Sequence, residues 1–310
     1  MESPRRHVPI ALPAHPAIRR PRARVTRLTV DLLSGQPVDA MVGIPQDCPD
    51  MTKLTLHFVG FNANMGPWEA AKCAVWACAT RTIVVMCELP GFSRHRHPLP
   101  DDIRHDLLKG DPSSWASLTL AALKSAAEQA NVPRPEEISV LAYSTGCSLA
   151  AACLPTIQQA YPVSSLTLVE PVSLTDRSLV HLAADNVTDL MRIWRTVPFN
   201  YPIPWVRQAA RRQTTEPSVH FSLPDFYALI TMLASDDTRV RLDDIDLPTT
   251  NLARGDLSKL CVGSEFARLD ERLGVRGIPG TTCKIAGLGH QFWHCVPAVD
   301  ATVWASGSWG

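Results

Sequence analysis

The stretch LAYSTGC at residues 141–147 constrains the fold more than any other part of the sequence. An apolar run with β-branched residues comes before it at 138–141, and an alanine-rich segment with helical character follows at 149–154. The sequence therefore predicts a strand, a sharp turn and a helix, with Ser144 at the apex. Small residues stand two positions before and after the serine, as a tight turn between a closely packed strand and helix requires. A buried serine that only caps a helix would also fit this stretch alone.

Strand-like and helix-like segments alternate around this turn. Strands are expected at 25–32, 38–44, 54–59, 82–88, 165–169 and 281–285, and helices at 67–79, 112–130 and 265–273. Such alternation predicts an α/β fold with a mostly parallel central sheet and helices on both faces. Residues 173–244 break the pattern, because they are helical in character, interrupted by prolines and rich in aromatic side chains.

The composition is that of an ordinary globular protein. The chain has 310 residues, of which 45% are hydrophobic and 19% charged, with a formal net charge of zero. This balance argues against a nucleic-acid partner, and no run is apolar enough to span a membrane. The 9 cysteines show no metal-type spacing, so we expect no metal, no cofactor and a reducing, cytoplasmic location. No pattern indicates an oligomeric state.

The first 24 residues differ from the rest in composition. They contain five prolines and six arginines and lack the apolar region of a secretion signal. Prolines would also break the amphipathic helix that a transit peptide needs. We predict that residues 1–24 form a flexible basic tail.

Four motifs together resemble the α/β-hydrolase fold family. VGF at 59–61 is similar to the family's oxyanion loop, with valine in place of histidine, and LPGFS at 89–93 is similar to the loop after the next strand. AYSTG at 142–146 resembles the nucleophile elbow, with alanine in the first glycine position. GLGHQF at 287–292 resembles the loop that carries the catalytic histidine. The resemblance extends over residues 25–306 and keeps the family's order, which implies the α/β-hydrolase fold.

The resemblance also implies a domain organisation. Residues 25–172 and 245–310 would form the hydrolase core, and residues 173–244 would form an inserted helical cap, or lid. An aromatic cap can exclude water and line an apolar pocket. Trp194 and Trp205 of the cap, together with Tyr143 beside the serine, are therefore the candidate pocket residues. The alternative is that the cap aromatics only pack the cap onto the sheet.

A catalytic triad is the chemistry that the resemblance implies. A serine hydroxyl needs a histidine to accept its proton, and the histidine needs a carboxylate to orient it. Ser144 and His290 are the expected nucleophile and base. Asp256 is the expected acid, because it follows a predicted strand at 247–253 and keeps the order Ser, Asp, His. Glu170, at the end of the preceding strand, is the alternative acid, since some lipases of the family place it there.

The expected function is that of a serine hydrolase. Backbone N–H groups of Phe61 and Thr145 are the candidate donors to the oxyanion. The substrate would be a small to medium hydrophobic carboxylic ester or thioester, cleaved through an acyl-enzyme on Ser144. The alternatives are a non-catalytic ligand-binding protein on the same scaffold, and an acyltransferase or C–C bond hydrolase with the same triad. The serine at the elbow excludes dehalogenase and epoxide hydrolase chemistry, which requires an aspartate there.

Overall fold

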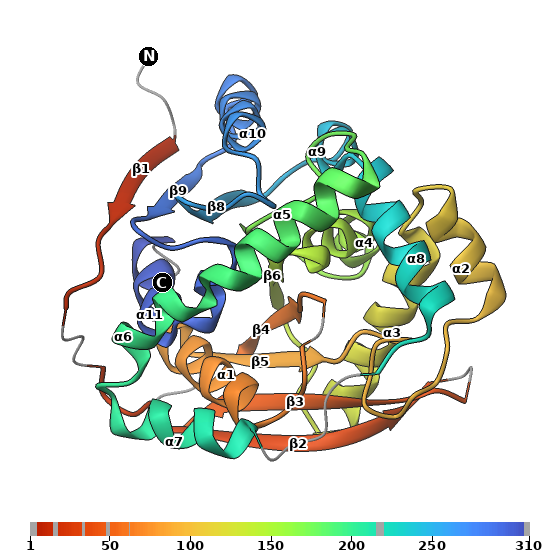
Figure 1. The fold of residues 1–310 in the computed structure, drawn as a ribbon. Coiled ribbons are helices and arrows are strands. Elements are labelled where there is room, and N and C mark those ends of the chain that lie inside the picture. Colours follow the sequence, from red (N-terminus) through yellow and green to blue (C-terminus); the bar gives the residue numbers. More distant parts are fainter. Residues whose placement is uncertain are drawn as a thin grey trace.

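A nine-stranded sheet forms the centre of the molecule (Figure 1). The computed structural model describes residues 5–14, 18–32, 35–47, 50–61, 63–214 and 220–306. The strand order is β1-β9-β8-β7-β6-β4-β5-β3-β2. Strands β2 and β3 pair antiparallel with each other, and β3 pairs antiparallel with β5, whereas all other neighbours are parallel. The predicted α/β architecture with a mostly parallel sheet is confirmed.

The elements alternate along the chain as the sequence indicates. The strands are β1 (Arg5–Ile10), β2 (Ala23–Asp31), β3 (Pro37–Pro45), β4 (Asp50–Phe58), β5 (Thr82–Cys87), β6 (Glu137–Tyr143), β7 (Val163–Val169), β8 (Thr249–Gly255) and β9 (Gly280–Ile285). The helices are α1 (Pro67–Thr80), α2 (Asp101–Leu108), α3 (Ser113–Gln129), α4 (Thr145–Ala160), α5 (Leu179–Met191), η1 (Arg192–Thr196), α6 (Val197–Asn200), α7 (Pro204–Gln213), α8 (Leu223–Ser235), α9 (Thr238–Asp243), α10 (Gly263–Val275), η2 (His290–His294) and α11 (Val296–Ser306).

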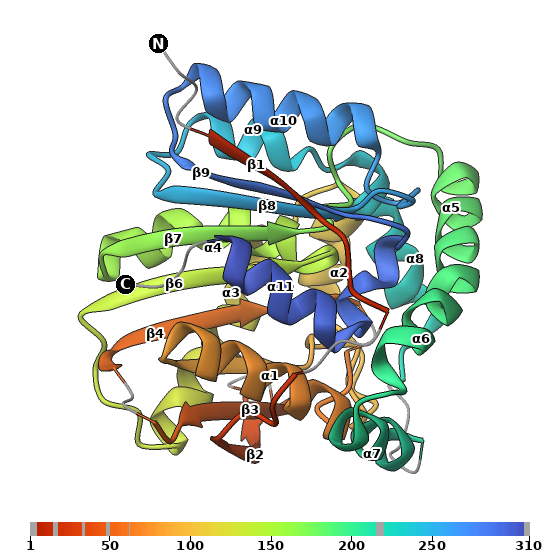
Figure 2. The same cartoon turned by 90° about the vertical axis from the view of Figure 1, so that its left-hand side faces the viewer.

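Helices cover both faces of the central strands (Figure 2). Helix α1 packs against α11 on one face, and α3 packs against α4 on the other. Every residue of β5 is buried, in keeping with its continuous apolar sequence. None of the helices within the described ranges is long and apolar enough to cross a membrane.

Residues 173–244, which we call the cap segment, connect β7 to β8. Helices α5 to α9 lie within it. Figure 2 shows α5, α6 and α8 beyond the arrowheads of β6, β7 and β8, at the edge of the sheet where these parallel strands end. The cap segment therefore stands at the sheet edge where ligands of open α/β sheets bind.

The prediction of a flexible tail over residues 1–24 is wrong for residues 5–10. Residues Arg5–Ile10 form β1, which pairs in parallel with β9 at the edge of the sheet. The Arg5 side chain is buried and its Nε lies 2.6 Å from Asp270 Oδ1. Its Nη2 also donates to Thr282 Oγ1 at 3.1 Å. The buried ion pair and the pairing with β9 stabilise β1 although this proline-rich sequence has a low propensity for regular structure.

We predict that the Arg5–Asp270 pair anchors β1. Arg5→Ala should lower the free energy of unfolding by about 3–5 kcal/mol, because the buried Asp270 carboxylate loses its arginine partner. Arg6→Ala is the matched control, since Arg6 is exposed on the same strand. Urea unfolding of both variants checks this; equal stabilities would show that β1 is not held by the ion pair.

Candidate active site

Ser144 occupies a strained turn between β6 and α4. Its φ of 55° and ψ of −120° are unfavourable for a residue with a side chain, and such backbone strain concentrates at functional sites. The Ser144 N–H donates to the Val169 carbonyl at 2.9 Å, which fixes the turn to the next strand. A Cβ atom at Gly146 would lie 2.1 Å from the Phe58 carbonyl oxygen, so only glycine fits there. This explains why the elbow requires glycine after the serine while Ala142 suffices before it.

His290 joins Ser144 to a carboxylate. Its Nε2 lies 2.9 Å from Ser144 Oγ, and its Nδ1 lies 3.0 Å from Glu170 Oε2. The three side chains are buried, with exposed fractions of 8% for Ser144, 2% for His290 and 0% for Glu170. A carboxylate on Nδ1 leaves Nε2 as the acceptor facing the serine hydroxyl, which is the arrangement needed for proton transfer.

Glu170 is held in place by several further contacts. It follows β7 directly with a φ of 53°, and its N–H donates to the Ala253 carbonyl at 2.8 Å. Its Oε1 accepts a hydrogen bond from the Gly255 N–H. Its Oε2 accepts one from Ser258 Oγ at 2.6 Å in addition to the contact with His290. These donors satisfy the buried carboxylate oxygens and fix their position beside the histidine.

The structure does not place Asp256 at the histidine. Asp256 is exposed, and its Oδ1 accepts a hydrogen bond from the Gly287 N–H at 2.8 Å. Strand β8 continues two residues beyond Ala253, the partner of Val169, and pairs with β9 there. Asp256 consequently faces the start of the histidine loop. The structure therefore places Glu170, the alternative acid from the sequence, beside His290 in place of Asp256, which contacts Gly287 instead.

The Tyr143 side chain packs against His290. Its ring stacks on the His290 ring with centroids 5.5 Å apart and an angle of 26° between the planes. Its hydroxyl donates to the His290 carbonyl at 3.1 Å. Tyr143 is buried, and burial raises the pKa of its hydroxyl well above the usual range. These contacts let Tyr143 orient His290, and its predicted place in a substrate pocket stays a prediction.

The two candidate oxyanion donors flank the serine. Thr145 is the first residue of α4, and the first N–H groups of a helix have no acceptor within the helix. A Cβ atom at Gly60 would lie 3.2 Å from Ser144 Cβ, so the loop that carries Phe61 passes directly beside the nucleophile. Buried Glu88 accepts hydrogen bonds from Met65 N–H and from the loop after β5, and burial raises the pKa of its carboxyl. This contact braces the Phe61 loop.

An aromatic cluster borders this loop. Phe61 packs on Phe92, Phe221 and Phe226 with ring centroids 5.5, 5.6 and 5.7 Å away. Phe221 and Phe226 belong to the cap segment, whereas Phe92 follows β5 in the LPGFS motif. Sequence reasoning did not select these phenylalanines as pocket residues, although their aromatic character and the position of Phe92 in a family motif were visible.

The two predicted pocket tryptophans have other surroundings. Trp194 is 73% exposed. The Trp205 ring N–H donates to the Ile18 carbonyl at 3.3 Å, which ties α7 to the N-terminal segment. The structure shows no contact of either tryptophan with Ser144 or His290 among the described residues, and their role as pocket residues stays a prediction.

Other reactive groups near the serine are inactivated by burial. Cys147 is fully buried in the first turn of α4, and burial raises the pKa of its thiol far above the usual range. His57 is buried beside Trp293, and burial lowers its pKa to about 3, so its ring is neutral. Within the described ranges, no group of three or more His, Cys, Asp and Glu side chains could hold a metal ion.

Solved structures with this architecture include hydrolases. An esterase from Pseudomonas putida ECU1011 aligns over 94% of this chain and 83% of its own, with 16% identity and a TM-score of 0.52. An esterase from Thermogutta terrifontis aligns over 90% and 96%, with 14% identity and a TM-score of 0.54. A bromoperoxidase from Bacillus anthracis aligns over 90% and 97%, with 14% identity and a TM-score of 0.54. The chain has the α/β-hydrolase fold. No model of a known family and no curated protein matches the sequence.

These similarities establish the fold. The chemistry of the site is inferred from its geometry, because one fold hosts many reactions. The α/β-hydrolase fold predicted from the four motifs is confirmed. Ser144 and His290 lie in contact as predicted, and Glu170 completes the contact chain.

We predict that Glu170, and not Asp256, sets the reactivity of Ser144. Glu170→Gln should slow labelling of Ser144 by a fluorophosphonate on the order of 10⁴-fold, because an uncharged partner holds the wrong histidine tautomer. Asp256→Asn is the matched control, since an amide oxygen can still accept the Gly287 N–H and labelling should stay close to that of the parent. A severe loss in Asp256→Asn with a mild one in Glu170→Gln would restore Asp256 as the acid.

Proposed function

We propose that this protein is a serine hydrolase that cleaves a carboxylic ester or thioester through an acyl-enzyme on Ser144. The observation that carries the proposal is the continuous contact from Ser144 Oγ through His290 to Glu170. A strained serine, a histidine in hydrogen-bond contact and a buried carboxylate together meet the requirements of nucleophilic catalysis. The esterases among the structural neighbours agree with this reaction class.

In the proposed mechanism each group has one step. Ser144 Oγ attacks the substrate carbonyl carbon while His290 Nε2 accepts the hydroxyl proton. Glu170 holds the Nδ1 proton and stabilises the imidazolium that forms. The N–H groups of Phe61 and Thr145 receive the negative charge on the carbonyl oxygen, and each such donor contributes about 10²–10³ in rate. Collapse expels the alcohol or thiol, protonated by His290, and a water activated by the same histidine then releases the acid.

The substrate class follows from the cluster of Phe61, Phe92, Phe221 and Phe226. Because Phe61 is also a candidate oxyanion donor, a group bound on these rings would lie next to the reacting carbonyl. Aromatic side chains bury large apolar surfaces, so the cluster suits a small to medium hydrophobic acyl or alcohol group. An acyltransferase or C–C bond hydrolase would use the same three side chains, and no contact in the structure favours either.

A non-catalytic binding protein is the remaining alternative. It would have no need for a strained serine or for two buried polar contacts to one imidazole, each of which requires compensation in the folded state. The intact chain from Ser144 to Glu170 therefore favours the enzyme. A non-catalytic binding protein would bind its ligand but would not turn it over.

The direct test is hydrolysis of p-nitrophenyl esters of graded acyl length. The parent should turn over the shorter and medium esters, and Ser144→Ala should retain only the background left when a triad member is removed, about 10³–10⁴ above water. Circular dichroism confirms that both proteins are folded. No turnover by the folded parent on any ester, together with no fluorophosphonate labelling, would reject the proposal.

We predict that Phe221 sets acyl preference. Phe221→Ala should raise kcat/KM for longer acyl chains relative to shorter ones, because it widens the aromatic wall beside Phe61. Phe221 is 42% exposed, so the melting temperature should change little. Trp194→Ala is the control and should leave the ratio unchanged. The same shift in both variants, or in neither, would remove the phenylalanine cluster from the substrate site.

A further inference from the structure

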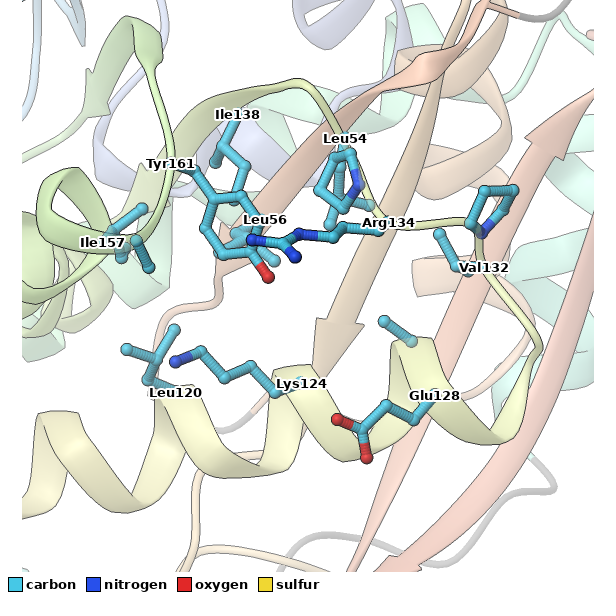
Figure 3. A pocket seen from close by; sticks show the side chains of 14 residues that line it. Leu54, Leu56, Leu120, Lys124, Glu128, Val132, Arg134, Ile138, Ile157 and Tyr161 are labelled. Carbon is cyan, nitrogen blue, oxygen red and sulfur yellow. The ribbon is translucent and has the colours of Figure 1, made fainter.

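A pocket lies between α3, α4 and the central strands, and Figure 3 shows side chains that line it. Its volume is about 290 Å³, and it lies where β4 and β6 begin, between the C-terminal ends of α3 and α4. Ile138 lines it and precedes Ser144 by six residues along β6 and the elbow, which is roughly 20 Å at ~3.3 Å per residue. The pocket shares no side chain with the candidate active site.

The interior of this pocket is apolar. Its lining includes the buried side chains of Leu54, Leu56, Leu120, Ile138 and Ile157. At ~30 Å³ for each water-sized group, the volume holds roughly ten non-hydrogen atoms. A surface pocket with such walls binds a hydrocarbon chain in preference to a polar group.

Two cationic side chains stand over the apolar walls. Figure 3 shows Lys124 and Arg134 pointing into the pocket from opposite sides. The Arg134 guanidinium lies over the Tyr161 ring, 6.0 Å from its centroid. In the described part of the chain, no ion pair is formed by either cation. Glu128 is the one acidic side chain that lines the pocket, so two positive charges face one negative charge.

The backbone that carries Arg134 is restricted. Pro133 and Pro135 flank Arg134, and each proline fixes its own φ, which limits the conformations of the connection between α3 and β6. The Val132 N–H donates to the Ala127 carbonyl at 2.9 Å, so the end of α3 is capped within the chain. A ligand therefore contacts apolar side chains and two cations, and little ordering of the protein backbone opposes binding.

We propose that this pocket binds a medium-chain carboxylate. The hydrocarbon chain would lie on the leucine and isoleucine side chains, and the carboxylate would lie between Lys124 and Arg134, which can form charge-assisted hydrogen bonds with it. A neutral ligand of the same size would form no charge-assisted hydrogen bond with either cation. A long hydrocarbon chain would exceed the volume of the pocket. Binding here requires neither Ser144 nor His290, and so it does not depend on the proposed hydrolase function.

The test uses sodium octanoate, which has ten non-hydrogen atoms, in calorimetric titrations of the full chain. The parent should bind it saturably, and octanamide, the neutral analogue, should bind more weakly. The double variant Lys124→Met, Arg134→Met should lose at least about tenfold in affinity, because each charge-assisted hydrogen bond contributes a factor of that order. Ala127→Phe, which fills the pocket from α3, should also abolish binding. Lys284→Met, which replaces an exposed lysine on β9, is the matched control and should bind like the parent.

The same experiment separates this pocket from the site at Ser144. Octanoate bound beside Ser144 would be unaffected by the Lys124 and Arg134 changes, and this result would overturn the proposal. Equal affinities for octanoate and octanamide, or no saturable binding by the parent, would also overturn it. Should Ala127→Phe not fold by circular dichroism, the charge variants decide the outcome, since both replaced side chains are exposed.

Discussion

The position of His290 between Ser144 and Glu170 is the interaction on which the rest of the site depends. The serine and the glutamate each follow the last residue of a strand, and those last residues, Tyr143 and Val169, are partners in the parallel pairing of β6 and β7. Parallel neighbours bring their carboxyl ends to one edge, so two residues far apart in the sequence become adjacent. The loop after β9 then needs only to deliver the histidine to this edge.

This arrangement strains the backbone. Ser144 and Glu170 both have positive φ, at 55° and 53°, and each such residue destabilises the fold by about 1–3 kcal/mol. The strain is offset by the surroundings of the two residues, which are buried at the end of the sheet and hydrogen-bonded through their own N–H groups to neighbouring strands. Both Ser144 and Glu170 are strained although they are far apart in the sequence. We infer that the positions of their side chains, and not local propensity, determine the backbone conformation of these two residues.

The cap segment is tied to the same site. Asp189 of α5 is fully buried and accepts hydrogen bonds from the N–H groups of Lys259 and Leu260, both at 2.8 Å. The neighbouring Ser258 donates to Glu170. The loop after β8 thus contacts Glu170 on one side and the cap segment on the other.

The sequence by itself determined the features that depend on neighbours along the chain. The strand, turn and helix around Ser144 follow from apolar periodicity and small residues, and the α/β class follows from alternation, so both were predictable without coordinates. His290 was predictable from its glycine-rich loop. Tertiary structure alone decided which carboxylate meets His290, because Asp256 and Glu170 both follow strands and only the longer extension of β8 directs Asp256 to Gly287. It likewise decided the pairing of β1 with β9, since the Arg5–Asp270 contact joins residues 265 positions apart and leaves no local pattern in the sequence.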